Sequence, residues 1–198
     1  MREKIIKLIT ESIYVKQIIL ESKLLLSIEE KLAEEIVHCI SNGGKLVICG
    51  NGGSASDALH FASEMIGKFQ KERKPWPVIV LNADVATLTS IANDYGYDEA
   101  FARQLEGHLT KKDIFIGIST SGNSENVYRA VLKAKEIGAK AAALLGMNGG
   151  KIGRVVDYPL IVPYKVTARV QESHILLIHI LCELVEDNLS ETKKVIES

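Results

Sequence analysis

Short apolar runs alternate with longer helical stretches along most of this chain, and this alternation constrains the fold more than any other feature. The runs that we predict to be buried strands are Lys45–Cys49, Val78–Leu81, Ile114–Ile118, Ala141–Leu145 and Tyr158–Val162. Strands separated by helices are parallel, because each helical crossover returns the chain to the same end of the sheet. The sequence therefore predicts an α/β fold with a doubly wound, five-stranded parallel sheet flanked by helices.

Apolar helices are predicted at both ends of the chain. Apolar residues recur at helical spacing in two groups between Met1 and about Ser41, and Asn42-Gly43-Gly44 ends the second group. The segment Val170–Val185 is too long and too apolar for an ordinary surface helix, so we expect it to be largely buried. The first helix shares this character. We therefore expect the helices at the chain ends to form subunit contacts in an oligomer.

The composition favours a small ligand over nucleic acid or a membrane. The 198 residues fit a single domain (1–198) with an N-terminal helical extension over about residues 1–42. Lys and Arg total 24 against 25 Asp and Glu, so no excess positive charge attracts a polyanion. No apolar run approaches the length of about 18 residues that spans a bilayer. Cys39, Cys49 and Cys182 are odd in number and far apart, which predicts reduced core thiols and a cytoplasmic protein.

A glycine-rich loop follows the first predicted strand and opens a helix. It reads Gly50-Asn51-Gly52-Gly53-Ser54-Ala55-Ser56-Asp57. In open parallel sheets, ligands bind at the carboxyl ends of the strands, where glycines let backbone amides approach them closely. The alternative is a tight turn capped by Ser54 or Ser56. The string matches neither the P-loop pattern nor the full dinucleotide-binding fingerprint, so both of those functions are disfavoured.

A hydroxyl-rich loop follows the third predicted strand. It reads Ser119-Thr120-Ser121-Gly122-Asn123-Ser124 and precedes a helix from about Glu125 to Ile137. Several hydroxyls at the positive end of a helix dipole can bind a phosphate without a lysine or arginine. One hydroxyl is enough to cap a helix, so a purely structural role leaves the others unexplained. The loop therefore predicts a phosphate site.

Two separated segments carry residues that suit acid–base or metal chemistry. His60 and Glu64 are four residues apart, so they share a helix face, with His60 nearer the predicted ligand edge. The last apolar helix contains the polar residues Gln171, Glu172, His174 and His179, and buried polar groups need partners. A solvated His/Glu pair and a satisfied core histidine are the structural alternatives. Gln171 and His179 are separated by about 12 Å of helical rise, so both reach one ion only if they lean inward or if a neighbouring subunit supplies one.

Taken together, these motifs resemble the bacterial phosphoheptose isomerases, a family with the sugar isomerase (SIS) fold. The resemblance covers nearly the whole chain and rests on Cys49–Asp57, His60 with Glu64, Asn93-Asp94, Ser119–Ser124, and Gln171-Glu172 with His179. It implies conversion of sedoheptulose 7-phosphate to D-glycero-D-manno-heptose 7-phosphate for the heptose of lipopolysaccharide core or capsule. It also implies one zinc ion per subunit and a homotetramer with active sites between subunits.

The resemblance also assigns roles to individual residues. The implied metal ligands are His60, Glu64, Gln171 and His179. The implied substrate contacts are Asn51, Gly52, Gly53, Glu64, Asn93, Asp94, Ser119, Thr120, Ser121, Ser124 and Gln171. Interconverting a ketose and an aldose moves a proton between C1 and C2 through an enediol, which needs a base near both carbons. The family implies Glu64 as this base and His179 as the acid.

Two other functions are compatible with a SIS fold. Proteins that bind the replication initiator DnaA resemble this family and act as tetrameric scaffolds. The set His60, Glu64, Gln171 and His179 favours an enzyme, because a scaffold has no chemical need for it. A regulatory SIS module would be attached to a DNA-binding domain, and we expect no room for one in this chain.

Overall fold

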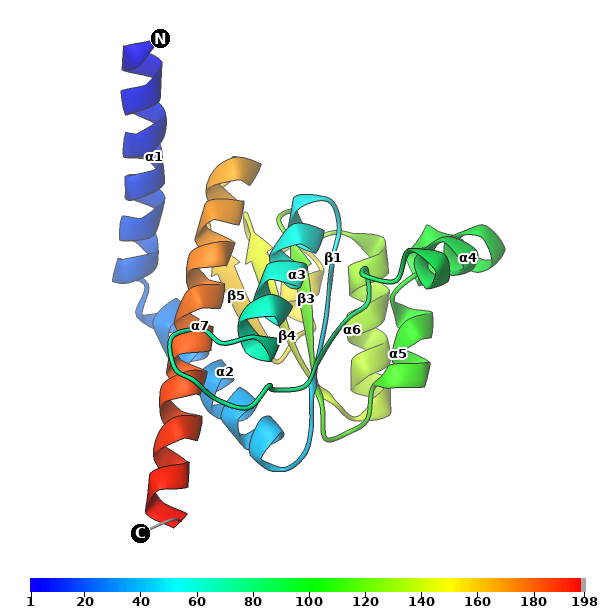
Figure 1. Cartoon of the computed structure of the whole chain (residues 1–198). Helices are drawn as coiled ribbons and strands as arrows, with labels where there is room; N and C mark the ends of the chain where they lie inside the picture. Colours follow the sequence, from blue (N-terminus) through cyan, green and yellow to red (C-terminus); the bar gives the residue numbers. More distant parts are fainter. Residues whose placement is uncertain (197–198) are drawn as a thin grey trace.

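The computed structural model describes residues 1–196 and contains a five-stranded parallel sheet with helices on both faces (Figure 1). The strand order is β2-β1-β3-β4-β5, and every neighbouring pair is parallel. The strands are β1 (Leu46–Gly50), β2 (Val78–Val80), β3 (Ile114–Ser119), β4 (Lys140–Gly146) and β5 (Tyr158–Val162). The predicted fold class is therefore confirmed.

The helices form two layers that enclose the sheet. They are α1 (Arg2–Glu21), α2 (Lys23–Ser41), α3 (Gly53–Ile66), α4 (Val85–Tyr95), α5 (Ala102–His108), α6 (Glu125–Ile137) and α7 (Thr167–Ile196), with short 3-10 turns at Tyr97–Glu99 and Ile152–Arg154. Helices α2, α3 and α7 share one hydrophobic core with Ile48 and Ile116 of the sheet. Helices α5 and α6 pack against the opposite face, which presents Val47 and Phe115. Alternate strand residues therefore fill two separate cores.

The two terminal helices differ in burial. Helix α7 is largely buried as predicted, and Val170, Leu177 and Val185 are at most 1% exposed. Helix α1 projects beyond the sheet layers (Figure 1) and, within the described chain, buries Val15 and Ile19 alone. Ile5, Ile9 and Ile13 remain more than half exposed, so the expectation that α1 resembles α7 in burial is wrong for the described chain. Among the described residues, the hydrogen bonds that join α1 to α7 begin at Leu8, whose carbonyl accepts from Arg169 at 2.8 Å, and residues 1–10 are all exposed.

The three cysteines agree with the prediction of reduced core thiols. Cys39, Cys49 and Cys182 are all free and buried. Burial raises the pKa of Cys39 to about 11 and that of Cys182 to about 12, so both thiols are protonated at neutral pH. Among the residues that the structure describes, no helix combines the length and the apolar character needed to cross a membrane.

Candidate active site

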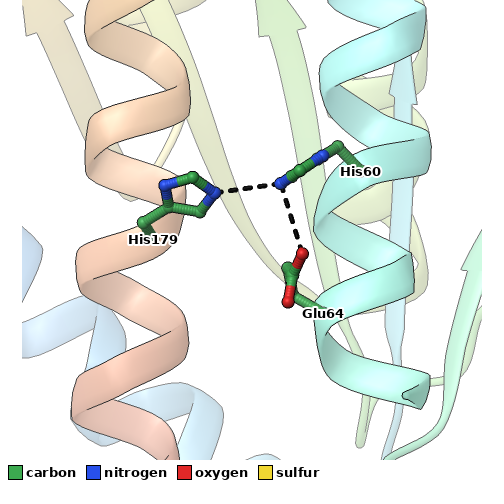
Figure 2. Close-up of side chains that lie close together, drawn as sticks. All are labelled: His60, Glu64 and His179. Atoms are coloured by element: carbon green, nitrogen blue, oxygen red, sulfur yellow. Dashed lines mark hydrogen bonds and ion pairs between the residues drawn. The ribbon is translucent and has the colours of Figure 1, made fainter. Parts of the chain in front are cut away.

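Two histidines and a carboxylate converge between helices α3 and α7. His60 and Glu64 lie on successive turns of α3, and His179 faces them from α7 (Figure 2). The Nε2 atoms of His60 and His179 are 2.9 Å apart, and Nε2 of His60 lies 3.3 Å from Oε1 of Glu64. One ligand atom from each residue lies within 4.8 Å of the others. The structure thus joins segments that are 119 residues apart in the sequence.

The donor set of this cluster fits a zinc ion. Zinc prefers neutral imidazole nitrogens and carboxylate oxygens, and donors at about 2.0–2.1 Å from one tetrahedral ion are themselves about 3.3 Å apart. The imidazole and carboxylate donors of His60, Glu64 and His179 approach this spacing. If His179 donates its Nε2 hydrogen to Nε2 of His60, then Oε1 of Glu64 faces His60 without a hydrogen between them. A cation among the three atoms would accept a lone pair from each of them. Two His and one Glu form a donor set that is found in catalytic zinc sites.

Gln171 lies against the glycine-rich loop. A Cβ atom placed on Gly53 would be 2.2 Å from Nε2 of Gln171, so the amide occupies the space that a larger residue would need. Helices α3 and α7 run side by side in this region (Figure 1), and Gln171 is two helical turns before His179. The position suits a contact to a ligand in the loop. Gln171 as the fourth metal ligand stays a prediction.

The glycine-rich loop does not use its serines as helix caps. Gly52, with φ of 56°, is the N-cap of α3, and no side chain caps it among the described residues. Ser54 and Ser56 lie inside the helix, so the capping alternative is wrong. The loop is tied to its neighbours by Asn51, whose side chain exchanges hydrogen bonds of 2.8 and 3.0 Å with Asn126. The amides of Ser54 and Ala55 each donate to a backbone carbonyl, that of Asn51 and that of Gly52, at 3.0 Å, so backbone hydrogen bonds close the first turn of α3.

The hydroxyl-rich loop gathers its serines at the start of α6. The Ser119 and Ser124 hydroxyls are 2.9 Å apart, and those of Ser119 and Ser121 are 3.5 Å apart. Ser124 is the N-cap residue, yet its side chain accepts no backbone amide in the described part of the chain. The hydroxyls thus exceed what the helix needs, as the sequence indicated. Thr120, between Ser119 and Ser121, is half-buried in the same loop.

A second glycine-containing segment supports the hydroxyl-rich loop from behind. A Cβ atom on Gly122, whose φ is 67°, would be 2.2 Å from the carbonyl oxygen of Gly149. The amide of Ile152 donates to the carbonyl of Gly122 at 3.0 Å, and the amide of Lys151 donates to Oδ1 of Asn123 at 3.1 Å. The loop after β4 therefore fixes the backbone of the loop after β3.

Asn93 and Asp94 lie away from the three converging side chains. They are exposed in the last turn of α4, and Nδ2 of Asn93 donates to Oδ1 of Asp94 at 2.9 Å. The end of α4 is connected to the glycine-rich loop through Tyr97, whose hydroxyl donates to Oδ1 of Asn51 at 2.7 Å. Their assignment as substrate contacts stays a prediction.

Two further polar groups near the site have shifted pKa values. Burial raises the pKa of Asp57 to about 6, although the nearby His60 opposes the shift. Burial also lowers the pKa of His174 to about 4, which keeps this fully buried imidazole neutral. His174 is therefore a core residue, but neither of its ring nitrogens has a hydrogen-bond partner among the described residues, so the alternative of a satisfied core histidine is not confirmed.

Sequence reasoning missed several residues that surround the site. Tyr97 and Asn126 hold Asn51, Phe69 packs against the ring of His179 at 5.7 Å, and Arg73 donates to the carbonyl of Glu64 at 2.7 Å. Arg73 lies in the charged run Lys71-Glu72-Arg73-Lys74, which is typical of a solvated loop. The one sequence feature that indicates a structural role for Arg73 is the nearby Trp76, since arginine stacks on aromatic rings.

A five-stranded parallel sheet with helices on both faces defines the class of doubly wound α/β proteins. The family model described as the SIS domain matches residues 14–146, and the chain is a SIS-domain protein. Among curated proteins it is 52% identical over 167 residues to a phosphoheptose isomerase of Helicobacter pylori, covering 83% of this chain and 87% of that one. It is 45% identical over 198 residues to a phosphoheptose isomerase of Aquifex aeolicus, covering 96% and 99%.

A solved structure agrees with these relatives. The phosphoheptose isomerase of Neisseria gonorrhoeae superposes with a TM-score of 0.88 at 42% identity, covering 94% of this chain and 98% of that one. The chain therefore belongs to the phosphoheptose isomerase family of SIS-domain enzymes.

Proposed function

We propose that this enzyme converts sedoheptulose 7-phosphate to D-glycero-D-manno-heptose 7-phosphate in the cytoplasm, as a step in bacterial heptose biosynthesis. The observation that carries the proposal is the convergence of Glu64 from α3 and His179 from α7 (Figure 2). The names of the relatives support the same substrate class. They also favour an enzyme over a scaffold that binds DnaA.

Glu64 is the base in this proposal. Its Oε1 faces His60 at 3.3 Å, which leaves Oε2 to take the proton from C1 of the ketose. Breaking the C1–H bond forms the C1=C2 bond of an enediol, and returning the proton to C2 gives the aldose. One carboxylate serves both carbons because they are adjacent. Its side chain is 22% exposed, so water has limited access to it.

His179 moves the second proton. As C1 loses its proton, O2 must gain one, and as C2 gains its proton, O1 must lose one. The imidazole nitrogen that is free of the metal can donate to O2 and accept from O1 in turn, which leaves the ring unchanged after one cycle. His179 is held for this work by the ring of Phe69 at 5.7 Å and by His60 at 2.9 Å.

We propose that His60, Glu64, Gln171 and His179 hold one zinc ion per subunit. Zinc, when bound, supplies Lewis-acid polarisation of a sugar carbonyl. The donor types of His60, Glu64 and His179 support this set. Of the four side chains, that of Gln171 must move most to reach the ion, since its amide packs against Gly53.

The phosphate end of the substrate is assigned to the hydroxyl-rich loop. The hydroxyls of Ser119, Thr120, Ser121 and Ser124 offer neutral donors, and the positive end of the α6 dipole favours an anion. The glycine-rich loop contacts the sugar through Asn51, Gly52 and Gly53. Asn93 and Asp94 bind sugar hydroxyls from the end of α4, close to Tyr97.

The assay that tests the function uses purified protein, sedoheptulose 7-phosphate and measured zinc. We expect aldose formation and about one zinc per subunit, as for a single-ion site. Chelation should abolish turnover, and zinc should restore it. Absence of product from zinc-loaded protein would contradict the proposed reaction, whereas full activity of metal-free protein would contradict the zinc assignment alone.

A further inference from the structure

The segment that connects α3 to β2 crosses the lower half of α7 (Figure 1) and is held there by a buried carboxylate. Glu186 of α7 accepts hydrogen bonds from the backbone amides of Phe69, Gln70 and Lys71 at 3.3, 2.8 and 2.9 Å. It also accepts one from Nε of Arg73 at 2.9 Å. The Glu186 side chain is 2% exposed, so this is an internal attachment of the segment and not a surface ion pair.

Arg73 joins this carboxylate to the end of α3. Its Nη2 donates to the carbonyl of Glu64 at 2.7 Å and its Nη1 to that of Met65 at 2.8 Å. The last carbonyls of a helix have no intrahelical partner, and a cation there is favoured by the helix dipole. The guanidinium also lies 3.5 Å over the ring of Trp76, and the side chain is only 6% exposed. Arg73 therefore fixes the backbone of the residue that we propose as the base.

The same segment reaches the proposed acid. Phe69, whose amide donates to Glu186, packs its ring 5.7 Å from the ring of His179. Glu186 follows His179 by seven residues, so both lie on one side of α7, about two helical turns apart. One carboxylate thus holds a segment that touches the backbone of Glu64 and the ring of His179.

Burial and hydrogen bonding act in opposite directions on this carboxylate. Burial by itself raises the pKa of Glu186, but the hydrogen bonds from Gln70, Lys71 and Arg73 lower it below the ordinary value. The group is therefore ionised at neutral pH, and its charge is matched by the Arg73 guanidinium. Arginine suits this role because its planar fork can bond a carboxylate and two carbonyls at once.

We propose that Arg73 and Glu186 are positioning residues that set the separation of Glu64 and His179 and thereby the zinc affinity and turnover of the site. This inference rests on the proposed function. The pair touches neither substrate nor metal and acts through the end of α3 and through Phe69. Displacements of about 1 Å can cost about 10²-fold in rate, so a modest change in this attachment has a measurable effect.

The test compares Arg73→Lys with a matched variant at Asp113, which directly precedes the central strand β3. Lysine keeps the positive charge but lacks the planar guanidinium group that bonds the carboxylate and the two carbonyls at once. Asp113→Asn is the control, because Asp113 is also a buried carboxylate with four donors: the amide and Nζ of Lys45 and the amide and hydroxyl of Thr110. Both variants should lose thermal stability, and circular dichroism should show that both are folded.

We expect only Arg73→Lys to lower zinc affinity, measured by chelator competition, by about 10–100-fold, the range found when groups behind metal ligands are removed. Its kcat should fall by about the same factor, with KM changed less than about threefold because the hydroxyl-rich loop is untouched. If Arg73→Lys does not fold, Phe69→Leu should show the same decrease in zinc affinity and kcat, since it keeps the amide hydrogen bond to Glu186 and loses the ring contact to His179.

Unchanged zinc affinity and kcat in folded Arg73→Lys, with stability lowered as in Asp113→Asn, would overturn the positioning role while leaving the proposed function intact. Wild-type protein that neither binds zinc nor converts the sugar phosphate would overturn the proposed function and this inference together.

Discussion

Glu29 of α2 is a carboxylic acid enclosed by the core between α2 and α7. It is 3% exposed, and neither of its oxygens has a hydrogen-bond partner among the described residues. Burial raises its pKa from 4.5 to about 8. The folded protein therefore holds a proton at neutral pH that the unfolded chain has released, and this proton ties stability to pH.

We predict that the free energy of unfolding falls as pH rises from about 5 to about 8, by up to about 1.4 kcal/mol per pH unit, because the unfolded state binds fewer protons. Glu29→Gln should remove most of this slope, since the amide has no charge to lose. Denaturant unfolding at several pH values across this range measures the slope. The control is Glu30→Gln, an exposed neighbour that should keep the wild-type slope. An unchanged slope in Glu29→Gln would contradict the assignment.

Ser121 provides a residue-scale test of the phosphate site. Ser121→Ala removes one hydroxyl from the cluster with Ser119 and Ser124, so KM should rise by about 10–100-fold, as expected for one hydrogen bond to a charged group. Steady-state kinetics checks this, with Ser41→Ala at the exposed end of α2 as the control. A wild-type KM in Ser121→Ala would show that the phosphate binds outside the hydroxyl-rich loop.

At the scale of elements, the close contact between the end of β4 and the hydroxyl-rich loop matters most. A Cβ atom on Gly146 would lie 2.2 Å from the carbonyl oxygen of Thr120 and 2.9 Å from Cγ1 of Val170. The first of these atoms belongs to the backbone, so the loop itself must shift to accept a side chain. The carboxyl end of β4 thus sets the position of the loop after β3.

We predict that Gly146→Ala destabilises the fold by about 1–3 kcal/mol, as overpacking does, and raises KM several-fold. Gly107→Ala is the control, because in α5 a Cβ atom would meet no described atom within 4 Å. Thermal melting and steady-state kinetics together separate the two effects. A stable variant with wild-type KM would show that the loop is independent of β4.

The elements were more predictable than the contacts between them. Buried parallel strands are continuous apolar runs, so no predicted strand end differs from the observed one by more than a residue. His60 and Glu64 were predictable as a pair because helical spacing places them on one face. The pairing of Arg73 with Glu186 was not, since both lie in charged segments that resemble solvated surface. Only the tertiary fold buries them.

For the whole molecule, the exposed apolar face of α1 indicates association. Ile9 and Ile13 are 55% and 63% exposed on a helix that projects beyond the sheet layers (Figure 1). Exposed apolar surface of this kind marks protein–protein contacts. We propose the homotetramer implied by the family resemblance, with α1 in its subunit contacts.

Ile13→Glu should therefore reduce the assembly to smaller species, because it introduces a charge into an apolar contact. Light scattering coupled to gel filtration measures the mass. Lys7→Glu, a charge change on the same helix, should leave the assembly intact. A monomeric wild-type protein would contradict the role of α1.

The central claim is that Glu64 removes and returns the proton of the sugar carbons beside His179. We propose to follow solvent deuterium incorporation into sedoheptulose 7-phosphate and its product, comparing wild type, Glu64→Gln and the exposed control Glu72→Gln, whose side chain is 86% exposed. Wild type and Glu72→Gln should exchange and isomerise, whereas folded Glu64→Gln should lose both by at least about 10²-fold. Exchange by Glu64→Gln at the wild-type rate would contradict the account.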